Sequence, residues 1–259
     1  MLNKTPRKPV SVNPQVLLIY SIPKAGKSTI IAGLTTEFAK GESLIISNER
    51  GGYDWLEAAV EECYNPYRFD ELITEISEDK DIKYVAIDTI TTLDEWSEYV
   101  GTFNYMRKPQ GSRFNVDTST GQRFKKDNPQ FMTVHEIPQG YGYKHSRDVM
   151  VDWFEKLRAT GKTIILVAHV KDKFITSKTG DVVQSIDINL TGKVKDIYCA
   201  KSDAIGMLVA EDEKRYLSFQ SKDDSKYMGS RASHLHGRIL ISERSEDGMV
   251  KTYWNNIFI

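Results

Sequence analysis

The sequence has few cysteines and almost no net charge. Of its 259 residues only Cys63 and Cys199 are cysteines, and they lie far apart in no metal-like spacing. This usage fits a reducing compartment better than a disulfide scaffold. Thirty-five Lys and Arg residues nearly balance 36 Asp and Glu residues, which gives a formal net charge of −1. The total charge therefore indicates no nucleic-acid partner, and any basic surface must be local.

Long apolar runs are also missing. No stretch of 18 consecutive apolar residues occurs, and the basic start of the chain, residues 1–13, lacks the apolar centre of a signal peptide. We therefore expect a cytoplasmic protein (in the host cytoplasm if it is viral) with no membrane partner. Residues 1–14 are expected to be a flexible lead-in, and residues 15–259 are long enough for a single domain with a large core.

Four short apolar runs are present and predict strands that are buried on both faces. They are residues 16–20, 43–47, 84–88 and 163–168. Between and after them, helical spacing or composition predicts helices over residues 28–40, 54–63, 69–76, 89–99 and 144–160. This alternation predicts an α/β fold with a mostly parallel, twisted sheet flanked by helices. Ligands of such sheets bind at the carboxyl ends of the strands.

The remaining segments are expected to decorate this core. Residues 105–143 are poor in aliphatic side chains and predict a long basic insertion, and residues 170–187 predict a polar loop. Residues 205–210 and 215–219 predict an antiparallel pair of C-terminal strands. Residues 222–236 are basic and irregular, and edge strands are expected over 238–241 and 252–259.

A phosphate-binding loop is predicted between the first strand and the first helix. Backbone N–H groups of such a loop point at phosphate oxygens, the lysine reaches the β- and γ-phosphates, and the following hydroxyl holds Mg²⁺. The cofactors expected are therefore ATP and Mg²⁺. The predicted binding residues are Ser21, Ile22, Pro23, Lys24, Ala25, Gly26, Lys27, Ser28 and Thr29. Ser21 stands where the pattern has glycine, which reduces backbone freedom and leads us to expect slow turnover rather than lost binding.

Three polar residues follow the other predicted strands, and each has two interpretations. Asp88 either completes the Mg²⁺ site with Ser28 or caps the helix that follows. Glu49 either activates the attacking water or is a solvated glutamate in a turn. His169 either senses the γ-phosphate or is a structural residue held by hydrogen bonds.

Together these residues resemble the RecA-like ATPases, and among them the phage-type RecA-like proteins related to single-strand-annealing ATPases. The resemblance rests on the loop from Ser21 to Ser28, Glu49 after the second strand, Ile87-Asp88 and Ala168-His169. It spans about residues 15–220. The resemblance implies that Lys27 and Asp88 are catalytic, that Glu49 is the catalytic base and that His169 is the sensor.

The same resemblance implies that single-stranded DNA binds loops after the later core strands. Residues 106–147 combine basic side chains with interleaved aromatic ones, a composition typical of single-strand grooves, and residues 171–178 follow the proposed sensor. A solvated insertion with no DNA contact is the alternative. The basic members of the first stretch are Arg107, Lys108, Arg113, Arg123, Lys125, Lys126, Lys144 and Arg147.

RecA-like ATPases usually place the nucleotide between subunits, so the resemblance implies a homo-oligomer. Lys222, Lys226 and Arg231 lie where a basic residue would complete the neighbouring site, and Arg231 is our candidate catalytic residue there. The alternative is an ordinary surface charge. The predicted function is a Mg²⁺-ATP-dependent ATPase that acts on single-stranded DNA in recombination, repair or replication. A hexameric helicase-like motor and a nucleotide-gated scaffold with little hydrolysis are the other possibilities.

Overall fold

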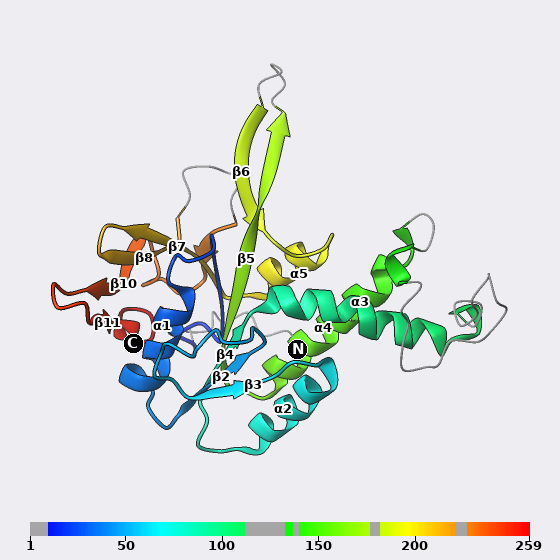
Figure 1. The fold of residues 1–259 in the computed structure, drawn as a ribbon, viewed down its shortest axis with the longest axis horizontal. Helices are drawn as coiled ribbons and strands as arrows, with labels where there is room; N and C mark the ends of the chain where they lie inside the picture. The colour runs from blue at the N-terminus through cyan, green and yellow to red at the C-terminus, as the bar shows by residue number, and fades with distance from the viewer. Residues whose placement is uncertain (1–9, 112–132, 137–139, 177–181, 221–226) are drawn as a thin grey trace, which may run out of the picture.

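A sheet of 11 strands forms the centre of the part of the chain that the computed structural model describes, which is residues 10–111, 133–136, 140–176, 182–220 and 227–259 (Figure 1). The strands are β1 Val16–Ser21, β2 Ser43–Ser47, β3 Val60–Glu62, β4 Tyr84–Asp88, β5 Thr163–Thr176, β6 Val182–Ile188, β7 Ala204–Glu211, β8 Lys214–Ser218, β9 Gly229–Ser230, β10 Arg238–Arg244 and β11 Val250–Thr252.

Most of the sheet is parallel. Across it the order is β11-β10-β8-β7-β1-β5-β4-β2-β3, with β6 paired to β5 and β9 paired to β7. Neighbouring strands run parallel from β3 to β7. The strands β8, β10 and β11 then extend the sheet as an antiparallel edge. The predicted fold class and the predicted C-terminal antiparallel pair are therefore confirmed.

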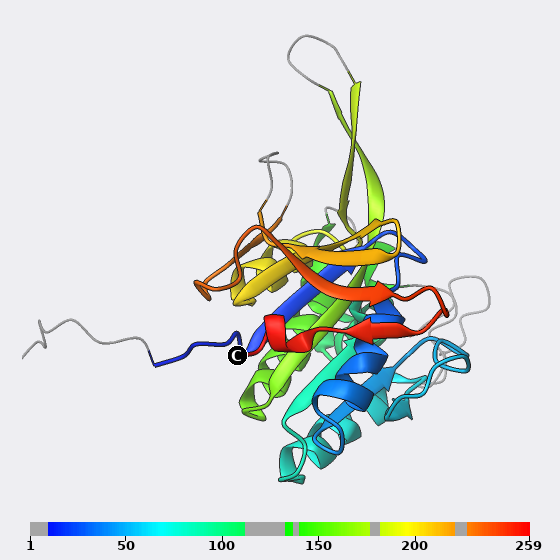
Figure 2. The ribbon, with the colours of Figure 1, turned by 90° about the vertical axis from the view of Figure 1, so that its left-hand side faces the viewer.

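Helices cover both faces of this sheet (Figures 1 and 2). They are α1 Lys27–Gly33, which continues as a π-helix over Leu34–Phe38, α2 Pro66–Glu78, α3 Ile90–Met106, α4 Tyr143–Ala159 and α5 Val194–Lys201. Short 3₁₀ turns occupy Val134–Glu136 and Trp254–Asn256.

Successive side chains of β1 point to opposite faces of the sheet, so they belong to two separate apolar cores. Val16, Leu18 and Tyr20 belong to one buried apolar cluster. Leu17 and Ile19 belong to the other. The first cluster contains side chains of α2, α4 and α5, and the second contains side chains of α1 and of the C-terminal segment. A strand buried on both faces reads as a continuous apolar run, which explains why β1 was recognisable in the sequence.

The helix predicted over residues 54–63 is wrong. The chain makes turns after Gly51 and then forms β3, which pairs in parallel with β2 at the end of the sheet. A three-residue strand at an edge has too few residues to show a period, so pairing with β2 decides its conformation.

The polar loop predicted over residues 170–187 is also wrong. Here β5 continues to Thr176 and pairs with β6 as a long antiparallel hairpin that rises from the body of the molecule (Figure 1). The β-branched residues at positions 175–176 and 182–183, on either side of Gly180 in the sequence, are the hairpin signal that was missed.

The edge strand predicted over residues 238–241 forms within β10, whereas the one predicted over residues 252–259 is wrong beyond Thr252. Only Val250–Thr252 is strand, and a 3₁₀ turn follows at Trp254–Asn256. The Trp254 indole donates a hydrogen bond to the Ile30 carbonyl oxygen (2.8 Å), which holds the C-terminal segment against α1.

Within the described residues, no helix is both long enough and apolar enough to cross a membrane.

Candidate nucleotide site

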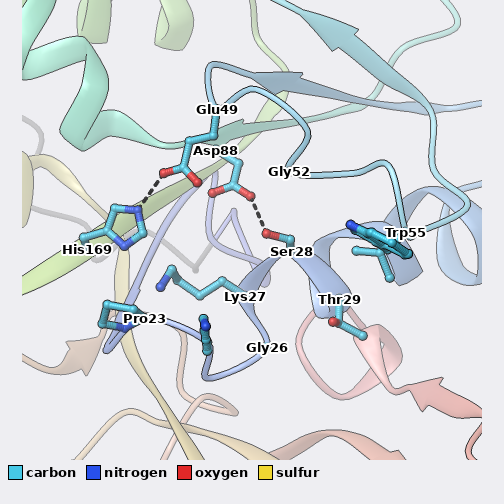
Figure 3. A pocket seen from close by; sticks show the side chains of 12 residues that line it. Pro23, Gly26, Lys27, Ser28, Thr29, Glu49, Gly52, Trp55, Asp88 and His169 are labelled. Atoms are coloured by element: carbon cyan, nitrogen blue, oxygen red, sulfur yellow. Dashed lines mark hydrogen bonds and ion pairs between the residues drawn. The ribbon is translucent and has the colours of Figure 1, made fainter.

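A cavity of about 590 Å³ opens at the carboxyl ends of the parallel strands. This volume lies within the roughly 300–1,000 Å³ typical of small-molecule sites. It is lined by Pro23, Lys24, Gly26, Lys27, Ser28, Thr29, Glu49, Gly52, Trp55, Leu56, Asp88 and His169 (Figure 3). Six of the nine predicted loop residues therefore reach the cavity, and Ser21, Ile22 and Ala25 are not among its lining residues.

The loop from β1 to α1 has the backbone shape that cradles an anion. Gly26 has a φ of 101° and Lys24 a φ of 62°, so two residues adopt the left-handed region. Such alternation turns successive N–H groups toward one side of a loop. The glycine at position 26 is therefore required by its φ.

Lys27 is folded back in this structure. Its ammonium group donates to the Ser21 carbonyl oxygen at 3.4 Å, to the Ser21 hydroxyl at 3.3 Å and to the Ile22 carbonyl oxygen at 3.2 Å. Burial lowers the pKa of Lys27, and the nearby carboxylates of Asp88 and Glu49 oppose that shift. Ser21 thus supplies an acceptor that a glycine at this position lacks.

Asp88 ends β4 and is buried, with 4% of its surface exposed. Its Oδ2 atom accepts hydrogen bonds from the Ser28 hydroxyl at 3.1 Å and from the Tyr53 hydroxyl at 2.7 Å. Burial raises the pKa of Asp88, while the Tyr53 hydrogen bond acts in the opposite direction.

The donor set around Asp88 fits Mg²⁺. Within the described ranges, no group of three or more His, Cys, Asp or Glu side chains is arranged to hold a metal ion. Mg²⁺ needs no such group, because it is bound by one or two carboxylates together with water and substrate phosphates. One hydroxyl and one carboxylate, Ser28 and Asp88, lie within hydrogen-bond distance of each other at the cavity.

Glu49 and His169 both line the cavity and are hydrogen-bonded to each other (Figure 3). The Glu49 Oε1 atom lies 2.7 Å from His169 Nε2, and this hydrogen bond is the main cause of the lowered pKa of Glu49. The backbone N–H of His169 also donates to the Thr91 hydroxyl at 3.1 Å, which ties β5 to the first turn of α3. The His169 Nδ1 atom is buried and has no hydrogen-bond partner among the described residues.

Arg231 is not brought to this cavity. Its guanidinium pairs with Asp203 Oδ1 at 3.0 Å and donates to the Ala200 carbonyl oxygen at 3.0 Å. Asp203 also accepts the backbone N–H of Val16 at 3.1 Å, which places Arg231 at the start of β1, opposite the phosphate-binding loop. Its predicted role in a neighbouring subunit stays a prediction.

Several residues proposed for DNA or neighbour contact lie outside the described residues. They are Arg113, Arg123, Lys125, Lys126, Lys222 and Lys226. Among the described ones, the Lys171 ammonium donates to the Leu190 carbonyl oxygen at 3.0 Å near the base of the β5–β6 hairpin.

Sequence reasoning missed one residue that lines the cavity, Trp55, and two that hydrogen-bond residues of the site, Tyr53 and Arg215. Trp55 is 91% exposed and forms one wall of the cavity, beside Thr29 (Figure 3). Tyr53 bonds Asp88, and Arg215 donates through Nε to the Ala25 carbonyl oxygen at 3.0 Å. Tyr53 and Trp55 could have been suspected from the sequence, because they are two aromatic residues that follow Glu49 and a pair of glycines. Nothing in the sequence pairs Arg215 with residue 25.

Comparison with known proteins gives a family match and structural likenesses, of which two are described here. The AAA domain family matches residues 13–227. No curated protein matches the chain. The KaiC-like protein PH0186 of the archaeon Pyrococcus horikoshii OT3 is 13% identical, with a TM-score of 0.45 over 92% of this chain and 88% of that chain. A RadB recombinase is 11% identical, with a TM-score of 0.44 over 93% of this chain and 92% of that one. At these low scores neither likeness says what this chain binds or does.

Proposed function

Because this chain belongs to the AAA domain family and is a P-loop ATPase, we propose that it hydrolyses Mg²⁺-ATP in the cavity described above and acts on single-stranded DNA. The observation that carries the proposal is the convergence of five side chains from four elements and their loops on one cavity. They are Lys27, Ser28, Glu49, Asp88 and His169.

Binding is proposed to begin with a rearrangement of Lys27. Its three present hydrogen bonds are long, at 3.2–3.4 Å, and all go to neutral oxygens. A triphosphate carries full negative charges that these neutral oxygens lack, so its Coulomb attraction would draw the ammonium into the cavity. The N–H groups of the loop and the first turn of α1 would hold the same phosphates.

Hydrolysis is proposed to use Glu49 as the base. The lowered pKa of Glu49 keeps its carboxylate ionised at neutral pH, as a proton acceptor must be. A water oxygen bonds to the γ-phosphorus, the bond from that phosphorus to the leaving ADP oxygen breaks, and Glu49 takes the water proton. When bound, Mg²⁺ supplies charge neutralisation to the phosphates, and Ser28 with Asp88 would hold it.

His169 is proposed to report the nucleotide state to DNA. It lies in β5 and contacts Glu49, while the same strand continues without interruption into the hairpin with β6. The backbone N–H of Asn189 donates to the His169 carbonyl oxygen at 2.8 Å, so both strands of the hairpin meet at this residue. DNA bound along the hairpin and the basic stretch 106–147 would thereby bias the Glu49–His169 contact.

A nucleotide-gated scaffold remains the second candidate, and one observation favours it. Glu49 Oε1 is hydrogen-bonded to His169 in this structure, and an enzyme whose base is held in that way would hydrolyse ATP slowly.

The proposal has two further parts. We propose that the chain is a phage-type protein, and that it forms a homo-oligomer in which Arg231 of one copy reaches the nucleotide site of the next.

Binding of fluorescent oligo-dT, measured over a series of salt concentrations with and without ATP, tests the DNA role. We expect salt-sensitive binding that changes with nucleotide, and faster ATP hydrolysis when oligo-dT is present. Absence of binding in every condition, with nucleotide binding intact, would reject the DNA role and favour the scaffold.

A further inference from the structure

The loop that joins β2 to β3 supplies residues on two sides of the cavity but contains no helix or strand. Residues 49–56 include Glu49 and Trp55, and the backbone hydrogen bonds within this stretch are local turns, such as Gly52 N–H to the Glu49 carbonyl oxygen at 3.3 Å. Turns of this kind shape a loop but do not fix its position over a cavity.

Two side chains connect this loop to neighbouring strands: Glu49 bonds His169 of β5, and Tyr53 bonds Asp88 of β4. The Tyr53 hydroxyl donates to Asp88 Oδ2 at 2.7 Å, which is shorter than the 3.1 Å bond that the Ser28 hydroxyl makes to the same atom. The Tyr53 ring packs against the apolar cluster that also contains Ile31 and Ala86. The partly buried ring therefore rests against the core, and its hydroxyl bonds Asp88.

Two donors on one oxygen fix how the Asp88 carboxylate is turned. Ser28 comes from α1 and Tyr53 from the 49–56 loop, so rotation of the carboxylate would break bonds to two separate elements. Neither donor uses Oδ1. Hydrated Mg²⁺ needs carboxylate oxygens held ready as acceptors, and orientation by outer hydrogen bonds is how proteins usually provide them.

We propose that Tyr53 is a positioning residue for metal-bound nucleotide: its hydroxyl fixes the Asp88 carboxylate and fastens the loop carrying Glu49 and Trp55 to it. The inference rests on the proposed function, since it requires Mg²⁺ and nucleotide to bind in this cavity. It assigns Tyr53 a specific role, which is to make nucleotide affinity depend on Mg²⁺.

The test is Tyr53→Phe, which removes only the hydroxyl and keeps the packed ring. ADP affinity would be measured by calorimetry in EDTA and again across a Mg²⁺ titration. We expect affinity in EDTA to stay within about twofold of wild type, because the phosphates are held by the loop. The Mg²⁺ concentration at half effect should rise about tenfold, as expected for one lost hydrogen bond to a charged group.

Tyr227→Phe is the matched control. The Tyr227 hydroxyl also donates to an aspartate, Asp196, at 2.9 Å, but this pair lies at α5, away from the cavity lining. The control should leave both the affinity in EDTA and the Mg²⁺ midpoint unchanged. In an Asp88→Asn background, adding Tyr53→Phe should produce no further change in the Mg²⁺ midpoint.

Three results would overturn the inference. Tyr53→Phe could keep the wild-type Mg²⁺ midpoint, or it could weaken ADP equally in EDTA and in Mg²⁺, which is the signature of a packing role alone. The effect of Tyr53→Phe could also persist undiminished in Asp88→Asn. Wild-type protein that binds no nucleotide in either buffer would instead reject the proposed function itself.

Discussion

Asp88 and Asp203 lie at opposite ends of the same sheet and differ in how their charges are met. Asp203 accepts the backbone N–H groups of Gln15 and Val16 at 3.0 and 3.1 Å and pairs with Arg231. Asp88 accepts only two hydroxyl hydrogen bonds, and burial raises its pKa. The charge of Asp203 is thus compensated by backbone N–H groups and an arginine, whereas burial makes the charged form of Asp88 energetically unfavourable.

Unsatisfied polar atoms cluster at the Asp88 end. In the part of the chain that the structure describes, six buried side-chain atoms lack a hydrogen-bond partner, and Asn48 Oδ1, Thr89 Oγ1 and His169 Nδ1 lie around the strand ends that carry Asp88 and Glu49. Each such atom costs about 1–3 kcal/mol. The charge of Asp203, at the amino ends of the strands, is thus met by the fold itself, whereas unsatisfied polar atoms gather at the carboxyl ends, where we propose that nucleotide binds.

The largest expected effect comes from Lys27→Ala. ATP affinity should fall about 100-fold, or about 2.7 kcal/mol, because the triphosphate loses its buried cation. Calorimetric titration with ATP measures it. Lys201→Ala, which removes a surface lysine paired with Glu155, is the control and should bind ATP as wild type does. Unchanged affinity in Lys27→Ala would remove the loop from the nucleotide site.

Substitutions of Asp203 and Asp88 should have different effects, the first on the stability of the fold and the second on nucleotide binding. Asp203→Ala should lower the free energy of unfolding by about 2 kcal/mol, because two backbone N–H groups lose their acceptor, and should leave ATP affinity unchanged. Asp88→Asn should change the free energy of unfolding by less than about 1 kcal/mol and weaken Mg²⁺-dependent ATP binding. Urea unfolding without nucleotide, paired with ATP titration, measures both. An Asp88→Asn variant that is much less stable but binds normally would reverse our assignment of the two ends.

Arg215→Ala tests whether the antiparallel edge supports the site. Removing the donor to the Ala25 carbonyl oxygen should weaken ATP about fivefold, which corresponds to about 1 kcal/mol. Arg238→Ala is the matched control, since Arg238 of β10 pairs with Glu211 of β7 rather than with a residue of the loop. Equal behaviour of the two variants would mean that the edge has no part in binding.

The smallest expected effect is a shift in pH dependence. His169 is the main cause of the lowered pKa of Glu49, so this hydrogen bond adds stability above pH 4.5 that is lost as pH falls through the folded-state pKa. His169→Ala should move the Glu49 pKa upward toward its ordinary value. The acid limb of the kcat profile should then shift to higher pH. A limb that stays in place would show that another group controls it.

Much of the core could be predicted from the sequence because its strands are buried on both faces. The run Val16–Tyr20 is apolar throughout, and so are residues 164–168. The hairpin of β5 and β6 and the short β3 could not be predicted in the same way. Their conformation depends on pairing with neighbouring strands, which local composition reports poorly.

The site was predictable where it follows strand ends and unpredictable where it depends on long-range contacts. Lys27, Ser28, Glu49, Asp88 and His169 each come directly after or close to an apolar run, so their meeting follows from a parallel sheet. The bond from Arg215 to Ala25 joins residues 190 positions apart. Such a contact depends on how the antiparallel edge packs, which no short motif encodes.

The continuity of β5 gives the molecule a mechanical lever. One strand of 14 residues is parallel to β1 and β4 in the core and antiparallel to β6 in the hairpin, with His169 near the change of partner. From His169 to Thr176 the strand advances seven residue steps and so spans roughly 23 Å, at about 3.3 Å per step. A sideways force at the far end of the hairpin produces a larger torque about His169 than the same force applied close to His169. A partner that pulled the hairpin sideways would therefore act on the Glu49–His169 contact with mechanical advantage, without entering the cavity.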